Sequence, residues 1–236
     1  MGYRTTLGDV NRNMSTRPAS IANRIVIDEA RLDGITNMSR DLAMLKEVER
    51  GGGPIVRIYE WKGAWISLGR SQVPKAVLRT GSSIPWVVRP TGGGAVLHGH
   101  DLTVSIAMNL KRDARKVKEI YRSVAMPIVG ALNDMGLDAT LGEDLPDRVL
   151  SSKSPDCFAS VSVNDIVDKQ SGMKLVGIAL RVTKSGILAQ CSIPVGKPLV
   201  DLASVFEVPH IPCESRVSKN RLREALNHRL AGLSAP

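Results

Sequence analysis

The sequence predicts an α+β fold with a central mixed β-sheet flanked by helices. Three observations carry this prediction: strand-like segments follow one another along the chain, helical segments lie between them, and glycine or proline stands at several of their boundaries. The chain has 236 residues, of which 43% are hydrophobic and 23% are charged, as in one globular domain. We expect residues 23–236 to form a single domain and residues 1–22 to form a flexible, polar N-terminal segment.

In the first half of the chain, strands are predicted over 25–35, 55–61, 64–68, 86–89 and 102–110. The first strand leads into a turn, and the second and third are expected to pair around Lys62-Gly63. In the fifth, apolar and polar residues alternate strictly, which predicts a strand that buries one face more completely than the other. A helix predicted over 37–50 repeats apolar residues at helical spacing and ends at the glycines before Pro54.

In the second half, the predicted elements are a helix over 114–135, a polar loop over 142–156, strands over 173–181 and 187–195, and a basic amphipathic helix over 216–230. Within the first of these helices, Pro127 is expected to cause a kink. Gly136 has the position of a C-terminal helix stop. The two strands are joined by a short turn that contains Gly186.

The chain is strongly basic, with a formal net charge of +9. Such a charge is typical either of a merely basic soluble protein or of one whose basic face steers an acidic protein partner. Nucleic-acid binding is not expected, because the Lys and Arg residues are dispersed, aromatic residues make up only 3% of the chain, and there is no recognition-helix or base-stacking motif.

Compartment and membrane association follow from the apolar segments and the cysteines. No segment approaches the ~20 consecutive apolar residues of a membrane helix, and residues 1–20 lack the apolar core of a secretory signal. The cysteines, Cys157, Cys191 and Cys213, are odd in number and lack metal-site spacing. We therefore expect a cytoplasmic protein without membrane contacts or a disulfide framework, in which Cys191 is a buried strand residue.

The most informative motif is the run from Arg89 to His98, which contains the triple glycine Gly92–Gly94 between two predicted strands. Glycine permits backbone conformations with positive φ and a close approach to a ligand. The N–H groups of such a loop can face an anion, with Arg89 and His98 adding charge and hydrogen bonds at its ends. A flexible surface connector is the alternative, and the other triple glycine, Gly51–Gly53, fits that description as a helix stop and linker.

The run from Arg89 to His98 resembles the Arg-x-(Ser/Thr)-Gly-Gly-Gly-Ala-Val-x-His loop of the lipoate–protein ligases, a branch of the biotin/lipoate ligase superfamily. Further matches follow in the family's order over roughly residues 25–195: Asn37-Met38 with Asp41, Arg57 to Trp61, Ser67 to Gln72, Leu102 to Ser105, Asn164 to Ile166 and Lys174 to Ala179. The resemblance implies a catalytic domain with the class II aminoacyl-tRNA synthetase and biotin synthetase-like fold. Residues 196–236 are too few for a C-terminal accessory domain, so a separate accessory subunit would supply that function or it is dispensable.

Lys174 is the first candidate catalytic residue, since it lies on an otherwise apolar strand where a buried ammonium needs an anionic partner. An exposed strand-end lysine is the alternative. The resemblance implies that Lys174 holds the acyl carboxylate and the ATP α-phosphate together, with Arg89 also balancing the phosphate. It implies that Asn164-Asp165 anchors nucleotide, with Asp165 as a Mg²⁺ ligand, whereas an Asx-type turn is the alternative.

The other residues for which the resemblance implies acyl-adenylate contacts belong to the glycine loop and the lysine strand. They are Thr91, Gly92, Gly93, Gly94, Ala95, Val96, His98, Gly177 and Ala179, alongside Arg89, Asn164 and Asp165. Close sheet packing is the alternative explanation for the two small residues of the lysine strand. Trp61, Trp65 and Met108 are expected to be core residues more than walls of an acyl pocket.

Cys157-Phe158 raises a different possibility. This pair resembles the nucleophile segment of the cysteine-dependent octanoyltransferases, which take octanoate from a carrier protein through a thioester without ATP. Cys157 would then be the nucleophile, with Lys174 as the cation that favours its thiolate. Against this interpretation, that branch usually has Arg where this chain has Gly94, and the Asn164-Asp165 turn is more similar to the ligases.

The resemblance therefore predicts first an ATP-dependent lipoate–protein ligase. Such an enzyme activates lipoate or octanoate as acyl-AMP, with ATP and Mg²⁺, and transfers the acyl group to a lysine of a carrier protein. The carrier would be the E2 lipoyl domain of a 2-oxoacid dehydrogenase, the glycine cleavage H protein or a similar protein. The alternatives are an octanoyltransferase that uses Cys157 and a non-catalytic homologue that binds an acyl-adenylate or a lipoylated protein.

Overall fold

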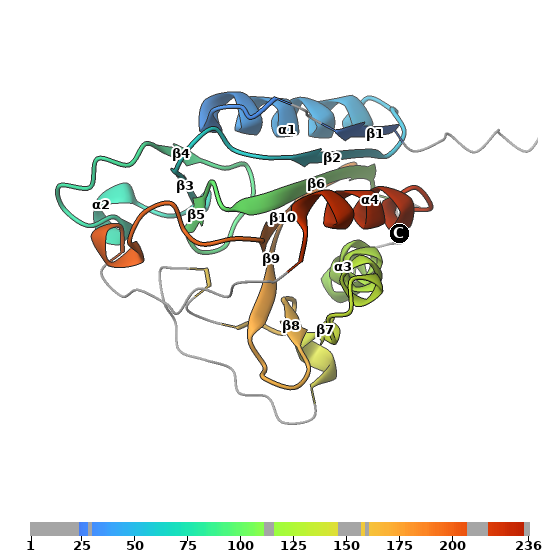
Figure 1. Ribbon diagram of the computed structural model, residues 1–236. Helices are drawn as coiled ribbons and strands as arrows, with labels where there is room; N and C mark the ends of the chain where they lie inside the picture. The colour runs from blue at the N-terminus through green and yellow to red at the C-terminus, as the bar shows by residue number, and fades with distance from the viewer. Residues whose placement is uncertain are drawn as a thin grey trace, which may run out of the picture.

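The computed structural model describes residues 24–27, 30–110, 116–145, 157–158, 161–206 and 217–233. Within these ranges the strands form a seven-stranded mixed sheet in the order β1-β2-β6-β10-β9-β8-β7 and a three-stranded sheet in the order β4-β3-β5 (Figure 1). Helices flank the larger sheet, which confirms the α+β prediction. The predicted segment 1–22, most of the predicted loop 142–156 and Cys213 lie outside the described residues.

The strands of the larger sheet are β1 (Arg24–Ile27), β2 (Ile55–Tyr59), β6 (Asp101–Asn109), β7 (Ala139–Leu141), β8 (Ile166–Asp168), β9 (Lys174–Val182) and β10 (Gly186–Pro194). Those of the smaller sheet are β3 (Trp65–Leu68), β4 (Trp86–Val88) and β5 (Val96–His98). The α-helices are α1 (Gly34–Glu49), α2 (Pro74–Val77), α3 (Val117–Asp134) and α4 (Lys219–Leu230), and there are 3₁₀ turns over Gly142–Asp144 and Leu202–Ser204.

The predicted helices are present at close to their expected bounds. The α1 helix begins after the N-cap Asp33, whose side chain accepts a hydrogen bond from the Thr36 backbone N–H. The α3 helix continues through Pro127 from Val117 to Asp134. Gly136 follows it with φ of +86°, a left-handed conformation that glycine adopts without steric cost and that ends the helix as predicted.

One strand pairing was predicted wrongly. We expected 55–61 and 64–68 to form a hairpin, but β2 pairs with β1 and β6, whereas β3 pairs with β4 and β5 in the other sheet. The chain turns away at Trp61, which makes a parallel bridge with Leu32 instead of continuing the ladder. The local turn signal at Lys62-Gly63 is compatible with both arrangements, so tertiary packing decides between them.

The two faces of the large sheet differ in chemistry, and both are buried. Val104, Ile106 and Met108 of β6 belong to the main apolar core, together with buried residues of α3 and α4. On the opposite face, Ala107 packs under α1 and Ser105 lies further along the strand. Figure 1 shows α1 on one side of the sheet and α3 and α4 on the other. The prediction that β6 is less buried on one face is therefore wrong, because α1 and the small sheet cover its polar face.

A buried carboxylate organises part of this polar face. Asp41 of α1, which is fully buried, pairs with Arg57 of β2 at 2.8 Å. It also accepts hydrogen bonds from the Tyr59 hydroxyl, the Ser105 hydroxyl and the Gln190 side-chain amide, at 2.6–2.8 Å. Three strands, β2, β6 and β10, are thus joined to α1 at one side chain. A buried charge is tolerated only with such complete pairing.

Replacing Asp41 with Ala should strongly destabilise the protein, because the buried Arg57 guanidinium loses its carboxylate. We expect the free energy of unfolding to fall by about 3–5 kcal/mol, measured by urea denaturation. The matched control is Arg24→Gln, which removes the exposed Arg24–Glu47 pair and should cost less than about 1 kcal/mol. Equal losses for the two variants would contradict this account of the Asp41 cluster.

Candidate active site

The glycine loop joins β4 to β5 and is folded around the side chain of Arg89. The Arg89 guanidinium donates to the Thr91 hydroxyl at 3.2 Å, to the Ser67 carbonyl at 2.9 Å and to the Gly94 carbonyl at 2.7 Å, and it also donates to the Gly92 carbonyl and the Ser67 hydroxyl. Its side chain is buried. All three guanidinium nitrogens of Arg89 thus donate hydrogen bonds to its own loop and to β3.

Burial alone lowers the pKa of Arg89, and the negative charge of Cys157 in its thiolate form acts in the opposite direction. An arginine with this many hydrogen bonds remains a cation at physiological pH. The predicted contact between Arg89 and a bound phosphate stays a prediction; in this structure the residue closes the loop.

Two glycines explain how the loop fits against β3. Gly93 has φ of +87°, which is favourable for glycine alone. Gly69 follows β3, and a Cβ at this position would lie 1.9 Å from the Gly93 carbonyl oxygen. Sequence reasoning noted Gly69 only as part of a family segment and missed this contact. A small residue directly after β3 was the available signal.

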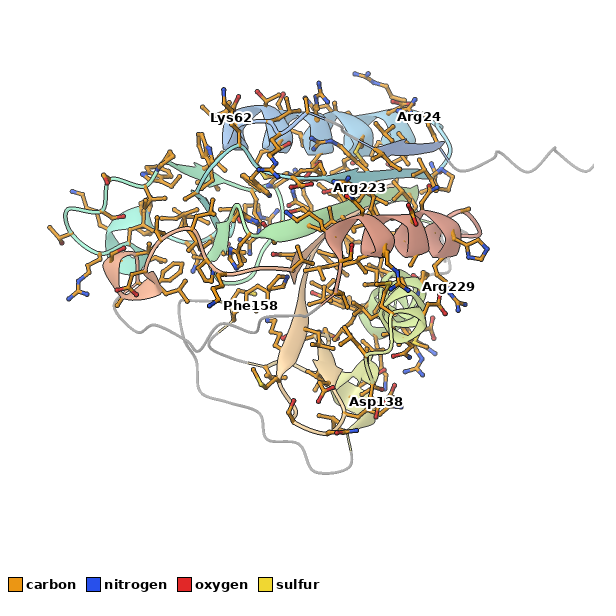
Figure 2. All side chains as sticks on the ribbon, in the orientation of Figure 1. Arg24, Lys62, Asp138, Phe158, Arg223 and Arg229 are labelled. Carbon is orange, nitrogen blue, oxygen red and sulfur yellow. The ribbon has the colours of Figure 1, made fainter. Side chains whose placement is uncertain are left out.

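Cys157 lies between the glycine loop and β9. Its backbone N–H donates to the Ala95 carbonyl at 2.9 Å. The Lys174 ammonium donates to the Cys157 carbonyl at 2.7 Å and contacts its Sγ at 3.3 Å. Phe158 (labelled in Figure 2) places its ring 5.2 Å from the same ammonium. The structure thus brings together the two candidates for catalysis, the thiol and the lysine.

The third partner of the Lys174 ammonium is Asp165, at 2.8 Å, and both side chains are 4% exposed. Burial alone would lower the pKa of Lys174, but the negative charges of Cys157 and Asp165 and their hydrogen bonds outweigh it and raise the pKa. The ammonium is therefore retained in the buried site. The same ammonium lies in contact with the Cys157 sulfur.

Asp165 and Asn164 form the turn before β8. The Asp165 carboxylate accepts the Ser162 backbone N–H at 2.7 Å, and the Asn164 backbone N–H donates to the Ser162 hydroxyl at 3.3 Å, as in a turn closed by a serine side chain. Among the described residues there is no group of three His, Cys, Asp or Glu side chains that would hold a metal ion. The Asp165 carboxylate is paired with Lys174, and the predicted contact of Asp165 with Mg²⁺ stays a prediction.

A pocket adjoins Cys157. Of the predicted site residues, Arg89, Val96, His98, Cys157, Gly177 and Ala179 line it. The remaining ones are not among its lining residues: Thr91 and Ala95 are buried in the loop with Gly92, Gly93 and Gly94, Lys174 contacts Cys157, and Asp165, which follows Asn164, pairs with Lys174. Gly177 is directly under the reactive groups, since a Cβ there would lie 3.3 Å from both the Cys157 Sγ and the Lys174 Cε.

The wall of the pocket near His98 is rigid and hydrogen-bonded. The His98 ring stacks on Trp61, with ring centroids 3.9 Å apart. Its Nδ1 lies 2.8 Å from the Asp101 carboxylate, and its Nε2 lies 2.8 Å from the Ser67 hydroxyl. Trp61 is fixed as well, because its indole N–H donates to the Thr103 hydroxyl at 2.9 Å. Trp61 is thus both a core residue and a pocket wall.

Sequence reasoning missed several residues that line the pocket, most of them polar. The pocket-lining residues without a prior assignment as site residues are Met38, Tyr59, Ser67, Thr103, Ile178, Gln190 and Ser192. Cys191 also lines it and is fully buried, as predicted for a strand residue. The available signal was the alternation of polar and apolar residues along β6, which was interpreted as a strand with one face less completely buried, and the polar residues of β10, which were not interpreted.

The structure contains no membrane-spanning segment among the described helices, because none is both long and apolar enough. Basic residues are spread over several elements: Figure 2 shows Arg24 on β1, Lys62 in the turn after β2, and Arg223 and Arg229 on α4. Several of them are paired, as Arg223 is with Glu60 at 2.6 Å.

Residues 33–230, which contain the glycine loop, Cys157 and Lys174, match the family described as the lipoyl protein ligase A/B catalytic domain. The chain belongs to this family.

Its relatives include the octanoyltransferases LipM of Lysinibacillus sphaericus and Bacillus subtilis. The first is 30% identical over 210 residues, covering 84% of this chain and 74% of the relative. The second is 28% identical over 211 residues, covering 85% and 75%.

Solved structures share the fold. A Thermoplasma acidophilum protein solved with bound lipoic acid has a TM-score of 0.70 at 22% identity, covering 89% of this chain and 85% of that one. Lipoate-protein ligase A bound with ATP has a TM-score of 0.64 at 24% identity, covering 89% and 84%. At these identities the likeness concerns the fold alone.

Gly177→Ala tests the contact between the thiol and the ammonium. The added methyl group would lie against both Cys157 Sγ and Lys174 Cε, so we expect the two to move apart and the rate of Cys157 alkylation by iodoacetamide to fall several-fold. Peptide mass spectrometry separates Cys157 from the other two cysteines. Gly232→Ala is the control, because a Cβ there meets no atom within 4 Å. An unchanged rate in Gly177→Ala would refute the arrangement.

Asp101 should stabilise the site in a pH-dependent manner. Burial alone would raise its pKa, but the charge and hydrogen bond of His98, with further contributions from His100 and Ser192, lower it below the ordinary value. A depressed carboxyl pKa contributes stability above the unfolded-state pKa of about 3.9, and this contribution is lost as the pH falls further.

Asp101→Asn should therefore reduce the free energy of unfolding at pH 7 by about 1–3 kcal/mol, and the gap to the wild type should narrow at pH 3. Urea denaturation at both pH values measures this. A gap of the same size at pH 3 and pH 7 would show that the carboxylate charge is not what stabilises the His98 wall.

Proposed function

We propose that this chain is an octanoyltransferase that moves an octanoyl group from a thioester donor to a lysine of a carrier protein, with Cys157 as the nucleophile. The observation that carries the proposal is the 3.3 Å contact between Cys157 Sγ and the Lys174 ammonium. Thiolates are good nucleophiles when a nearby cation stabilises them. The LipM relatives, at about 30% identity over most of the chain, support the same chemistry.

The reaction has two acyl transfers. In the first, the Cys157 thiolate attacks the thioester carbonyl carbon of the donor, an S–C bond forms to Cys157 and the S–C bond to the donor breaks. The donor leaves as a thiolate, which takes up the proton that the Cys157 thiol gave to solvent on ionisation. In the second, the ε-amine of the carrier lysine attacks the Cys157 thioester, an amide bond forms, and the Cys157 sulfur is released while the amine gives up its proton. Neither step consumes ATP. Lys174 stabilises the sulfur anion at the start and at the end of the cycle.

The acyl chain of such an intermediate would begin in the pocket beside Cys157. The small or apolar residues that line this pocket with Cys157 include Val96, Gly177, Ile178 and Ala179. The glycine loop would then position the nucleophile through the hydrogen bond from the Cys157 N–H to the Ala95 carbonyl. The stacked Trp61 and His98 would form one wall around the chain.

The ATP-dependent ligase is the second candidate, and its solved relatives share the fold. It has weaker support from the site. Both cations assigned to the phosphate, Arg89 and Lys174, make their hydrogen bonds to protein atoms, and the Asp165 carboxylate is paired with Lys174 instead of being placed for Mg²⁺. A separate accessory subunit remains a prediction of this second interpretation.

The acceptor would be a lipoyl-type carrier in the cytoplasm, such as an E2 lipoyl domain or a glycine cleavage H protein. A T. acidophilum lipoate protein ligase with the same fold was solved in a study with its E2 lipoyl domain. The net charge of +9 would favour encounter with an acidic carrier.

Octanoyl acyl carrier protein, without ATP, should acylate the purified chain, and intact-mass analysis should place the octanoyl group on Cys157. Adding an apo lipoyl domain should then move the group to the domain lysine. Cys157→Ala should abolish both products while retaining the fold.

A parallel reaction with ATP, Mg²⁺ and lipoate separates the two candidates. Lipoylation of the domain by Cys157→Ala under these conditions, with no acylated Cys157 in the wild type, would reject the transferase and favour the ligase.

A further inference from the structure

A line of buried hydrogen bonds leads from α1 to the glycine loop. The Gln190 side-chain amide donates to Asp41 at 2.6 Å, the Thr91 hydroxyl donates to the Gln190 side-chain oxygen at 2.7 Å, and the Arg89 Nε donates to the Thr91 hydroxyl at 3.2 Å. The four side chains are between 0% and 7% exposed, so water does not compete for these bonds. We call these four residues the Asp41–Arg89 relay.

The direction of every bond in the relay is fixed by chemistry. An ionised carboxylate can only accept, so the Gln190 NH₂ group must face Asp41 and its oxygen must face Thr91. Thr91 has one hydroxyl proton, which goes to Gln190, so this hydroxyl must accept from Arg89. The salt bridge between Arg57 and Asp41 fixes the first member of the series. There is thus one consistent arrangement of donors, and a flip of the amide would break two bonds.

Hydrogen bonds continue from the last member of the relay, Arg89, to the loop that holds the nucleophile. Beyond Thr91, the Arg89 guanidinium holds the Gly92 and Gly94 carbonyls, and the next carbonyl along the chain, that of Ala95, accepts the Cys157 N–H. The position of the Cys157 backbone therefore depends on the loop, and the shape of the loop depends on the orientation of Arg89. Within the relay, Arg89 is the member whose guanidinium donates to the loop carbonyls.

We propose that Gln190 and Thr91 are positioning residues that set the glycine loop, and through it Cys157, for acyl transfer. This proposal rests on the proposed function. Thr91 acts through Arg89, and Gln190 acts through Thr91, so their contribution is to geometry. Misplacing a reacting group by about 1 Å can cost about 100-fold in rate. Loss of the relay should therefore lower kcat and leave donor binding nearly unchanged.

Thr91→Val and Thr91→Ser form the matched pair for the test. Valine keeps the shape of threonine without the hydroxyl, whereas serine keeps the hydroxyl. With octanoyl acyl carrier protein as donor, we expect Thr91→Val to lower kcat by about 10- to 100-fold, with KM within about threefold of the wild type. Thr91→Ser should restore kcat to within about threefold. A side chain that only fills space would give the opposite order, because valine fills it better.

Gln190→Met provides a second variant of similar volume, which cannot bridge Asp41 and Thr91 and should show the same fall in kcat. Circular dichroism and thermal unfolding select variants that fold. A folded Gln190→Met or Thr91→Val protein with wild-type kcat would overturn the proposal, as would a Thr91→Ser protein as slow as Thr91→Val.

The wild-type protein tests the proposed function independently of the variants. If the wild type forms no acyl-Cys157 and lipoylates with ATP and lipoate instead, the ratios of variant to wild-type kcat are measured in that reaction. The positioning role is then supported if Thr91→Val and Gln190→Met lower kcat in that reaction while Thr91→Ser does not, and it is contradicted by any other order.

Discussion

The burial of a polar sheet face is the constraint on which the rest of this structure depends. Ser105, Gln190 and their neighbours lie under α1 and the small sheet, where an unpaired donor or acceptor would be costly. Two carboxylates meet this requirement: Asp41 accepts from four side chains, and Asp101 accepts from His98, Thr103 and Ser192. Both carboxylates accept hydrogen bonds from side chains of several strands, and some of these side chains line the pocket. The bonds that stabilise the fold therefore also fix the polar side chains of the pocket.

This arrangement gives the glycine loop a role different from that of a simple anion cradle. A loop that waits for a phosphate would present its cation to the ligand, whereas Arg89 here directs its donors to Ser67, Thr91 and the loop carbonyls. The loop is therefore shaped before any ligand binds, and such preorganisation removes the cost of ordering it during the reaction. The consequence is a backbone carbonyl, that of Ala95, in place to hold Cys157.

The sequence predicted correctly those features that depend on residues close together in the chain. Helical periodicity predicted α1, α3 and α4, and the family motifs predicted the loop, Lys174 and Cys157 as parts of one site. It failed where distant segments decide. The alternation along β6 does not reveal that α1 covers the polar face, and no local signal shows that Gly69 lies against Gly93. The pairing of Asp165 with Lys174 was not predicted either, because it depends on how β8 and β9 pack.

The choice between an adenylate and a thioester at such a site depends on what the lysine ammonium faces. A lone buried ammonium requires an anion from the substrate, and a phosphate would supply it. Here Asp165 already supplies one negative charge at 2.8 Å, and Cys157 supplies a group that becomes a second one on deprotonation. A phosphate would have to displace these contacts at the cost of a buried carboxylate left without its partner. A neutral thioester carbonyl makes no such demand, so the contacts of Lys174 favour a donor without phosphate at the reacting centre.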